Sequence, residues 1–453
     1  MNSALTGIMR LTDLRSKIVI TILLLVLCRV GGFIPIPGIN GEYAVNYFRS
    51  MTGGGQNLFQ LVDSFTGGAF SQMNVNALGV MPYISASIIL QIVVALIPSF
   101  QREMKENQEA AKRKLGRYTR LLTLVLSFMQ ALFFANFALR IGLESPGVIA
   151  SEVLTFTLFG APVLFYALVV MGMTTGTLFL MWVGERITEY GIGNGISMII
   201  SLNILSQLPT AIGLIVQQLN LDSPEFGQMS FSSVAVLIGI FVAVSWGTIL
   251  IVQGHRRIPL QYARRVVGRR EVQGNASYLP LKVNYAGVIP VIFASAFLMF
   301  PATIGQLLPG SSWIYSVTEY LTPGTPFYLC LYVLLIIACT YFWTSTQFKP
   351  DQIASDMKRT GAFIPGIRQG KATQDYLEST MNRITFIGAC SLALIAVLPT
   401  LFSRFLGIPH SISYFFGGTA LLILVGVILD TMKQVESHLL MNRYDGFMKK
   451  SRY

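Results

Sequence analysis

Ten long apolar segments dominate this chain and restrict what it can fold into. Each is about 17–25 residues long, enough for a helix to cross a hydrocarbon core of about 30 Å. Hydrophobic residues make up 53% of the chain and charged residues only 12%. We therefore predict an all-α integral membrane protein with ten transmembrane helices. The predicted spans are residues 18–36, 77–97, 119–139, 160–183, 193–216, 232–253, 285–303, 327–347, 384–403 and 412–433.

The basic residues indicate how the spans are oriented, because cytosolic loops of membrane proteins are enriched in Lys and Arg. With the N-terminus inside, all but four of the 33 Lys and Arg residues fall in cytosolic segments. The four exceptions are Arg29, Arg49, Arg140 and Arg404. We therefore expect a multi-pass protein with both termini in the cytoplasm.

Ten spans divide into two halves of five near residue 220, which predicts domains of residues 1–220 and 221–453. An odd number of spans in each half makes the second half enter the membrane from the opposite side. If the halves are structural repeats, they are inverted, and a transport pathway is expected at their interface. The sequence shows no obvious internal repeat, so this expectation rests on the architecture.

One further apolar segment is too short to cross a membrane. As a helix, residues 57–66 would be about 15 Å long, and they are followed by Gly67-Gly68. A segment that does not span must lie on the surface or inside a cavity lined by protein. The charge pattern places it on the outer side, where it is a candidate stopper with the glycines as its pivot.

Isoleucines recur at four-residue spacing on the second and fifth spans, and further ones lie on the seventh and tenth. Composition alone favours ordinary lipid-facing or core positions for them. The alternative is a ring of apolar side chains around a pore, which closes by excluding water. The candidate ring residues are Ile84, Ile88, Ile196, Ile200, Ile292 and Ile423.

Ionisable side chains are nearly absent from the spans, with Arg29 and Asp430 near the ends of the first and last. Ion-coupled carriers usually need carboxylates or histidines inside the membrane, so a secondary transporter of a small solute is the disfavoured alternative. The common enzyme motifs are also missing, and we expect no catalysis, no cofactor and no metal site. The glycines of 191–195 resemble a phosphate loop, but they join two spans and favour a tight turn.

Two predicted cytosolic loops, residues 254–284 and 348–383, are too long and too basic for simple connectors. The first contains Arg256 and Arg257, and the second presents Arg368 among glycines and a proline. Membrane topology and attraction to anionic lipid account for part of this charge. Arginine clusters also suit RNA phosphates and acidic protein surfaces.

Several long motifs, in the same order, resemble the SecY/Sec61-alpha family, the channel subunit of the bacterial Sec protein translocon. The similarity extends from about residue 10 to residue 446. The motifs that carry it are Phe33–Gly38, Ala77–Gln91, Gly191–Ser197, Leu281–Pro290 and Gly361–Gly370.

This resemblance implies an hourglass-shaped channel between two inverted five-helix halves. Residues 57–73 match the plug that seals the outer funnel, and the six isoleucines fall at or near the pore ring. The second and seventh spans, with the third and eighth, would form a lateral gate to the lipid. The plug residues would then be Leu58, Phe59, Leu61, Val62, Phe65, Gly67 and Gly68.

The resemblance also implies partners in the bacterial inner membrane. The channel would pass unfolded secretory chains and release membrane segments into lipid after a signal peptide opens the gate. Arg256, Arg257 and Arg368 match loop positions that engage the SecA motor or the ribosome, including its RNA. SecE would clamp the two halves, and SecG would be peripheral. Gln369 departs from the family pattern, which often has proline there, so this loop is expected to be slightly less rigid.

Overall fold

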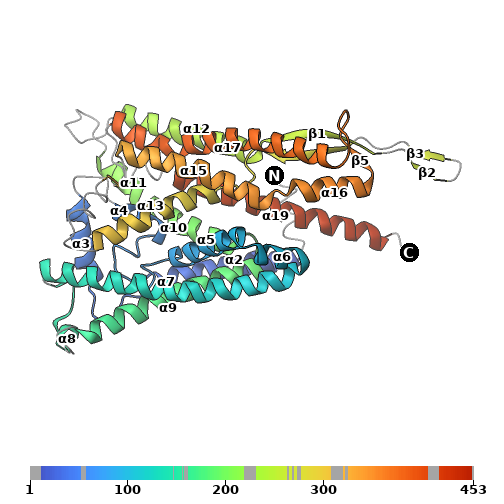
Figure 1. Ribbon diagram of the computed structural model, residues 1–453. Coiled ribbons are helices and arrows are strands. Elements are labelled where there is room, and N and C mark those ends of the chain that lie inside the picture. The colour runs from blue at the N-terminus through green and yellow to red at the C-terminus, as the bar shows by residue number, and fades with distance from the viewer. Residues whose placement is uncertain are drawn as a thin grey trace.

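Long helices dominate the computed structural model (Figure 1). The structure describes residues 12–52, 58–145, 147–155, 157, 162–218, 231–262, 265–267, 270–272, 277–307, 320–321, 325–406 and 418–450. The helices are α2 (Thr12–Gly31), α3 (Gly41–Thr52), α4 (Leu58–Thr66), α5 (Met81–Leu96), α6 (Pro98–Glu106), α7 (Gln108–Glu144), α8 (Ser151–Leu154), α9 (Val163–Tyr190), α10 (Gly195–Leu205), α11 (Leu208–Gln218), α12 (Phe231–Gln253), α13 (Ile289–Leu307), α15 (Pro326–Gln347), α16 (Pro350–Thr360), α17 (Lys371–Leu406) and α19 (Thr419–Lys450). The strands are β1 (His255–Tyr262), β2 (Arg265–Val267), β3 (Arg270–Val272), β4 (Ser277–Lys282) and β5 (Ala362–Phe363).

Every predicted span coincides with helix over most of its described length. Within the described residues, six helical segments are long and apolar enough to cross a membrane, one of which, Gly195–Gln217, includes both α10 and α11. Two shorter apolar helices are Met81–Leu96 and Ile289–Leu298. The prediction of an all-α membrane protein is confirmed, and the count of ten spans is consistent with these helices.

The fifth predicted span is two helices instead of one. Helix α10 ends at Leu205, and the chain turns at Ser206 and Gln207 before α11 begins at Leu208. Pro209 explains the break, because proline has no N–H to continue the ladder of α10 and is accepted in the first turn of α11.

The first predicted span ends five residues early. Helix α2 stops at Gly31, and the N–H groups of Gly32 and Phe33 donate to carbonyls of its last turn. Pro35 then forms an isolated bridge with Asn74. Two glycines followed by Pro35 and Pro37 stop the helix although the segment is apolar.

The two long basic loops fold together at one end of the molecule. Strand β1 pairs antiparallel with β4 on one side and with β5 on the other, so the sheet order is β4-β1-β5. Ile258 and Leu260 of β1 and Leu281 of β4 are buried, and they share an apolar cluster with Leu377 of α17. The outward side chains of β1 are exposed, as the period of two requires.

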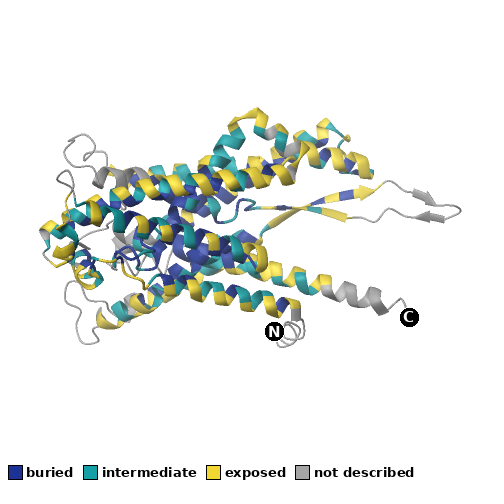
Figure 2. Ribbon diagram, turned by 90° about the horizontal axis from the view of Figure 1, so that it is seen from below, coloured by how far each residue is buried: buried dark blue, intermediate teal, exposed yellow. Residues whose placement is uncertain are grey.

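The helices form two groups in Figure 1. One contains α12, α13, α15 and α17, and the other contains α2, α5, α7 and α9. Helices α3, α8 and α11 lie at one end, whereas the strands, α16 and the C-terminal part of α19 lie at the other. Buried residues concentrate along the middle (Figure 2). Apolar side chains such as Leu23 of α2 and Trp246 of α12 are exposed on the outside, where a bilayer would cover them.

Candidate functional site

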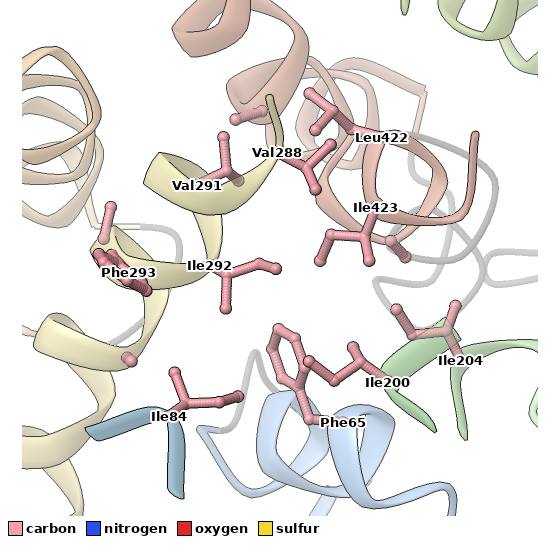
Figure 3. Close-up of a cluster of buried hydrophobic side chains, with 14 of the residues drawn as sticks. Phe65, Ile84, Ile200, Ile204, Val288, Val291, Ile292, Phe293, Leu422 and Ile423 are labelled. Carbon is pink, nitrogen blue, oxygen red and sulfur yellow. The ribbon is translucent and has the colours of Figure 1, made fainter. Parts of the chain in front are cut away.

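An apolar cluster lies where α4, α5, α10, α13 and α19 meet (Figure 3). Five of the six predicted ring isoleucines are buried in it, each with no more than 5% of its surface exposed. In Figure 3, side chains from all five helices point toward one another around a common centre. The ones that do so are Phe65, Ile84, Ile200, Ile292 and Ile423. Ile88 lies one turn beyond Ile84 on α5, in the same cluster.

Ile196 occupies a different position from the other five isoleucines. It is only partly buried, and its side chain packs against Gly184 of α9 at the start of α10. Further along α10, Ile204 is buried to 2% exposure and belongs to the cluster. Ile204 continues the four-residue spacing of Ile196 and Ile200, which is the signal that could have added it to the prediction.

The half-length helix α4 lies against the central cluster. It contacts α10 and α13, and Phe65 enters the cluster with only 2% exposure. Val62, also buried, packs instead into a second apolar cluster with residues of α3, α7 and α9. The side chains of Leu58, Phe59 and Leu61 lie outside the part of the chain whose side chains the structure describes.

Three polar side chains from outside α4 donate hydrogen bonds to the main chain at its end. Asn203 Nδ2 of α10 donates to the carbonyl of Phe65 at 2.9 Å. Gln207 Nε2 donates to the carbonyl of Asp63 at 2.9 Å. Arg29 Nη1 of α2 donates to the carbonyl of Gly67 at 2.9 Å. These contacts were not predicted from the sequence, since polar residues inside a span do not reveal their partners.

Gly67 and Gly68 end α4 in left-handed backbone, with φ of +68° and +89°. Such φ values favour glycine and are typical of helix C-termini. A Cβ at Gly67 would stand 2.9 Å from Ser206 Oγ, whereas a Cβ at Gly68 would meet open space. Gly67 therefore also permits the close approach of α4 to the α10–α11 turn.

Helix α13 joins the two groups of helices. It contacts α5 and α7 on one side. On the other, Ser295 Oγ lies 3.2 Å from Tyr332 Oη of α15, and the rings of Phe293 and Trp343 pack edge to face at 5.4 Å. The four helices expected to form a lateral gate are thus in contact along one seam.

The predicted partner-binding arginines lie at the end of the molecule that carries the sheet. Arg256 and Arg257 are exposed on β1, and Arg368 is exposed in the loop between β5 and α17. The Arg257 guanidinium stacks over the ring of Tyr278 at 5.0 Å. Gln369 Nε2 donates to the carbonyl of Ala362 at 3.2 Å, so this side chain itself braces the loop.

The glycine-rich segment 191–195 is a turn between α9 and α10. Its N–H groups already have partners, because Ile192 donates to Thr21 Oγ1 and Gly193 donates to Gln434 Oε1. They are therefore not free to cradle a phosphate. Among the described residues there is also no group of three or more His, Cys, Asp or Glu side chains placed to hold a metal ion.

Comparisons with known proteins agree with this arrangement. The family model SecY matches residues 74–432. "Protein translocase subunit SecY" of Chlamydia trachomatis is 58% identical over 451 residues and covers 99% of both chains. The Bacillus subtilis protein of that name is 40% identical over 454 residues, covering 99% of this chain and 100% of its own.

Two solved structures share the fold at lower identity. "The structure of a protein conducting channel" gives a TM-score of 0.61 at 20% identity and covers 93% of this chain and 92% of its own. "Sec61 in the Canine ribosome-channel complex from the endoplasmic reticulum" gives 0.56 at 18% identity, with the same coverage. The match to most of the chain, at high identity to full-length relatives, shows that this protein belongs to the SecY family.

Proposed function

We propose that this chain is the pore-forming subunit of a Sec translocon, a passive protein-conducting channel in a bacterial inner membrane. The observation that carries the proposal is the apolar cluster in which five helices converge on α4. Members of the family are named as translocase subunits, and a related structure is described as a protein-conducting channel. The pathway runs through the cluster, between the two groups of helices.

The chemistry of the cluster suits a substrate that presents every kind of side chain. A site with fixed polar partners would hold some segments tightly and stall them. Isoleucines such as Ile84, Ile292 and Ile423 offer contacts without directional preference, so an unfolded chain can slide past them. The same side chains, packed on each other or on a chain, exclude water and ions.

In this proposal α4 is the plug and the seam beside α13 is the lateral gate. A related structure is described with a plug domain that stabilises the closed state of its channel. A signal peptide of about ten apolar residues binds the open seam better than the closed one, and this difference in affinity shifts the equilibrium toward opening. Membrane segments then leave sideways through this seam, which α5 and α7 border on one side and α13 and α15 on the other.

The energy for transport comes from outside this chain, which hydrolyses nothing. A SecA motor or a translating ribosome binds the sheet end, where Arg256, Arg257 and Arg368 are exposed. Arginine suits carboxylates and RNA phosphates equally, since its planar fork donates to both. SecE clamps the two halves, 1–220 and 221–453, and SecG lies at the periphery.

Deletion of residues 60–68 tests the proposal. The channel with its SecE and SecG partners is reconstituted into planar bilayers, and its resting ion conductance is measured without substrate. Loss of α4 removes Phe65 from the centre, so we expect a conductance well above that of the intact protein. A conductance equal to that of the intact protein would contradict the assignment of α4 as the plug.

A further inference from the structure

The end of α4 has more carbonyl groups than its own helix can satisfy. A helix leaves its last four carbonyls without an intrahelical donor, and in a short helix these are nearly half of all its carbonyls. At the centre of a membrane channel, unpaired carbonyls are costly unless water or protein donors reach them. The Gly68 N–H and the Thr66 hydroxyl donate to the carbonyl of Asp63, and further donors come from elsewhere in the fold.

The three side-chain donors from outside α4 come from two stretches of the chain. Arg29 is in the last turn of α2, Asn203 is on α10, and Gln207 is in the turn between α10 and α11. All three bonds are 2.9 Å long and end on main-chain carbonyls, those of Gly67, Phe65 and Asp63. These hydrogen bonds therefore depend on the backbone path of α4 and not on the identity of its side chains.

Each donor also has a constraint that does not come from α4. Asn203 is only 9% exposed and lies between two ring positions on α10, Ile200 and Ile204. The guanidinium of Arg29 also lies over the Phe33 ring at 5.2 Å. Gln207 owes its position to the helix break that Pro209 imposes. These constraints reduce the side-chain freedom that docking of α4 would have to remove.

We propose that Arg29, Asn203 and Gln207 form a latch that holds α4 in the closed position through its main-chain carbonyls. This inference rests on the proposed function of α4 as a plug and assigns it positioning residues outside the apolar ring. The ring supplies the seal, and the latch supplies the preference for the closed position. When α4 leaves, the three donors lose their partners together, so the latch resists displacement as a unit.

Resting conductance tests the latch through Asn203→Ala, Gln207→Ala, Arg29→Met and the double variant of the first two. The net strength of a buried hydrogen bond predicts a rise of roughly two- to tenfold for each neutral donor removed. We expect a larger rise for Arg29→Met and for the double variant. Asn136→Ala is the control, because Asn136 is exposed on α7, where it donates to the carbonyl of Leu132 and accepts from Tyr166 Oη of α9. Its conductance is expected to equal that of the unaltered channel.

A crosslink separates loss of the latch from general damage. A Cβ at Gly79 would lie 3.8 Å from Thr66 Cβ, a spacing that disulfides accept, so oxidation of Thr66→Cys with Gly79→Cys can fix the end of α4. Gly79 has left-handed backbone with φ of +57°, so the same cysteine pair in an otherwise unaltered channel is the reference for the strain that the pair adds. In the double latch variant, oxidation of this pair should return the conductance to that of the unaltered channel, and reduction should raise it again. A conductance that stays high after crosslinking would overturn the latch.

The deletion of 60–68 distinguishes failure of the latch from failure of the proposed function. If that deletion leaks and all the latch variants conduct like the unaltered channel, the latch is overturned and the plug remains. If the deletion and the latch variants all conduct like the unaltered channel, the plug itself is overturned, and the latch with it. A leak from the deletion and from the latch variants, reversed by the crosslink, supports both.

Discussion

The central cluster and the sheet end of this molecule are built on opposite principles. In the cluster, Phe65 and the ring isoleucines meet from five helices through contacts that have no direction. At the sheet end, β1 is fixed in register against β4 and β5, and its arginines are exposed on a rigid support. Under the proposed function, the fold combines a deformable apolar passage with a rigid docking platform. We expect that each region can be altered without changing the other.

Arg368→Glu should have the largest effect, and it concerns the platform alone. Reversing a charge that pairs with a motor or ribosome costs about 2–5 kcal/mol of binding free energy, at least about thirtyfold in affinity. We expect motor-driven export in reconstituted vesicles to be nearly abolished, while membrane insertion of the protein and its resting conductance remain unchanged. Normal export would show that the basic residues of these loops only set the orientation of the protein in the membrane.

A polar group in the ring should have the next largest effect, confined to the passage. Ile423 is fully buried in the central cluster, and Ile423→Asn places an amide there without a partner. An unsatisfied buried polar group costs about 1–3 kcal/mol, so the closed-to-open ratio should fall at least about fivefold. Resting conductance should rise accordingly. Ile428→Asn on the exposed face of the same helix is the control and should not raise it.

Ile258→Ala should have a smaller functional effect and should act through the stability of the platform. Ile258 is 2% exposed in the cluster beneath the sheet, and removing its buried methyl groups destabilises the surrounding fold by about 2–5 kcal/mol. We expect faster amide hydrogen exchange in β1 and β4, moderately weaker export and unchanged resting conductance. A rise in conductance would show that the two regions are coupled and would contradict their separation.

The sequence predicted the helices better than it predicted what joins them. About 20 apolar residues can cross a membrane only as a helix, so length and hydropathy located the spans. The break at Ser206 and Gln207 was missed although Pro209 was visible, because the segment is apolar on both sides. The β1–β5 pairing joins residues about a hundred positions apart, and no local pattern reports such a partner.

The four-residue spacing of the isoleucines predicted part of the candidate site. This repeat placed Ile84 and Ile88 on one helix face, and both are buried in the central cluster. The same repeat included Ile196. Its side chain packs against Gly184 of the neighbouring helix α9, and the sequence of α10 alone does not indicate this contact. Asn203 could be recognised as polar within a span, but its partner, the carbonyl of Phe65, became evident only from the packing.

Crosslinking to a stalled secretory chain tests whether the translocation pathway runs through the ring. Cysteines replace Ile88 or Ile292 in the cluster, and Val242→Cys on the exposed face of α12 is the control. A translocating chain is halted midway and carries one cysteine in the segment that lies within the membrane. We expect crosslinks from Ile88→Cys and Ile292→Cys and none from Val242→Cys. Crosslinks absent at both cluster positions, while the chain is shown to be engaged, would contradict a pathway through the ring.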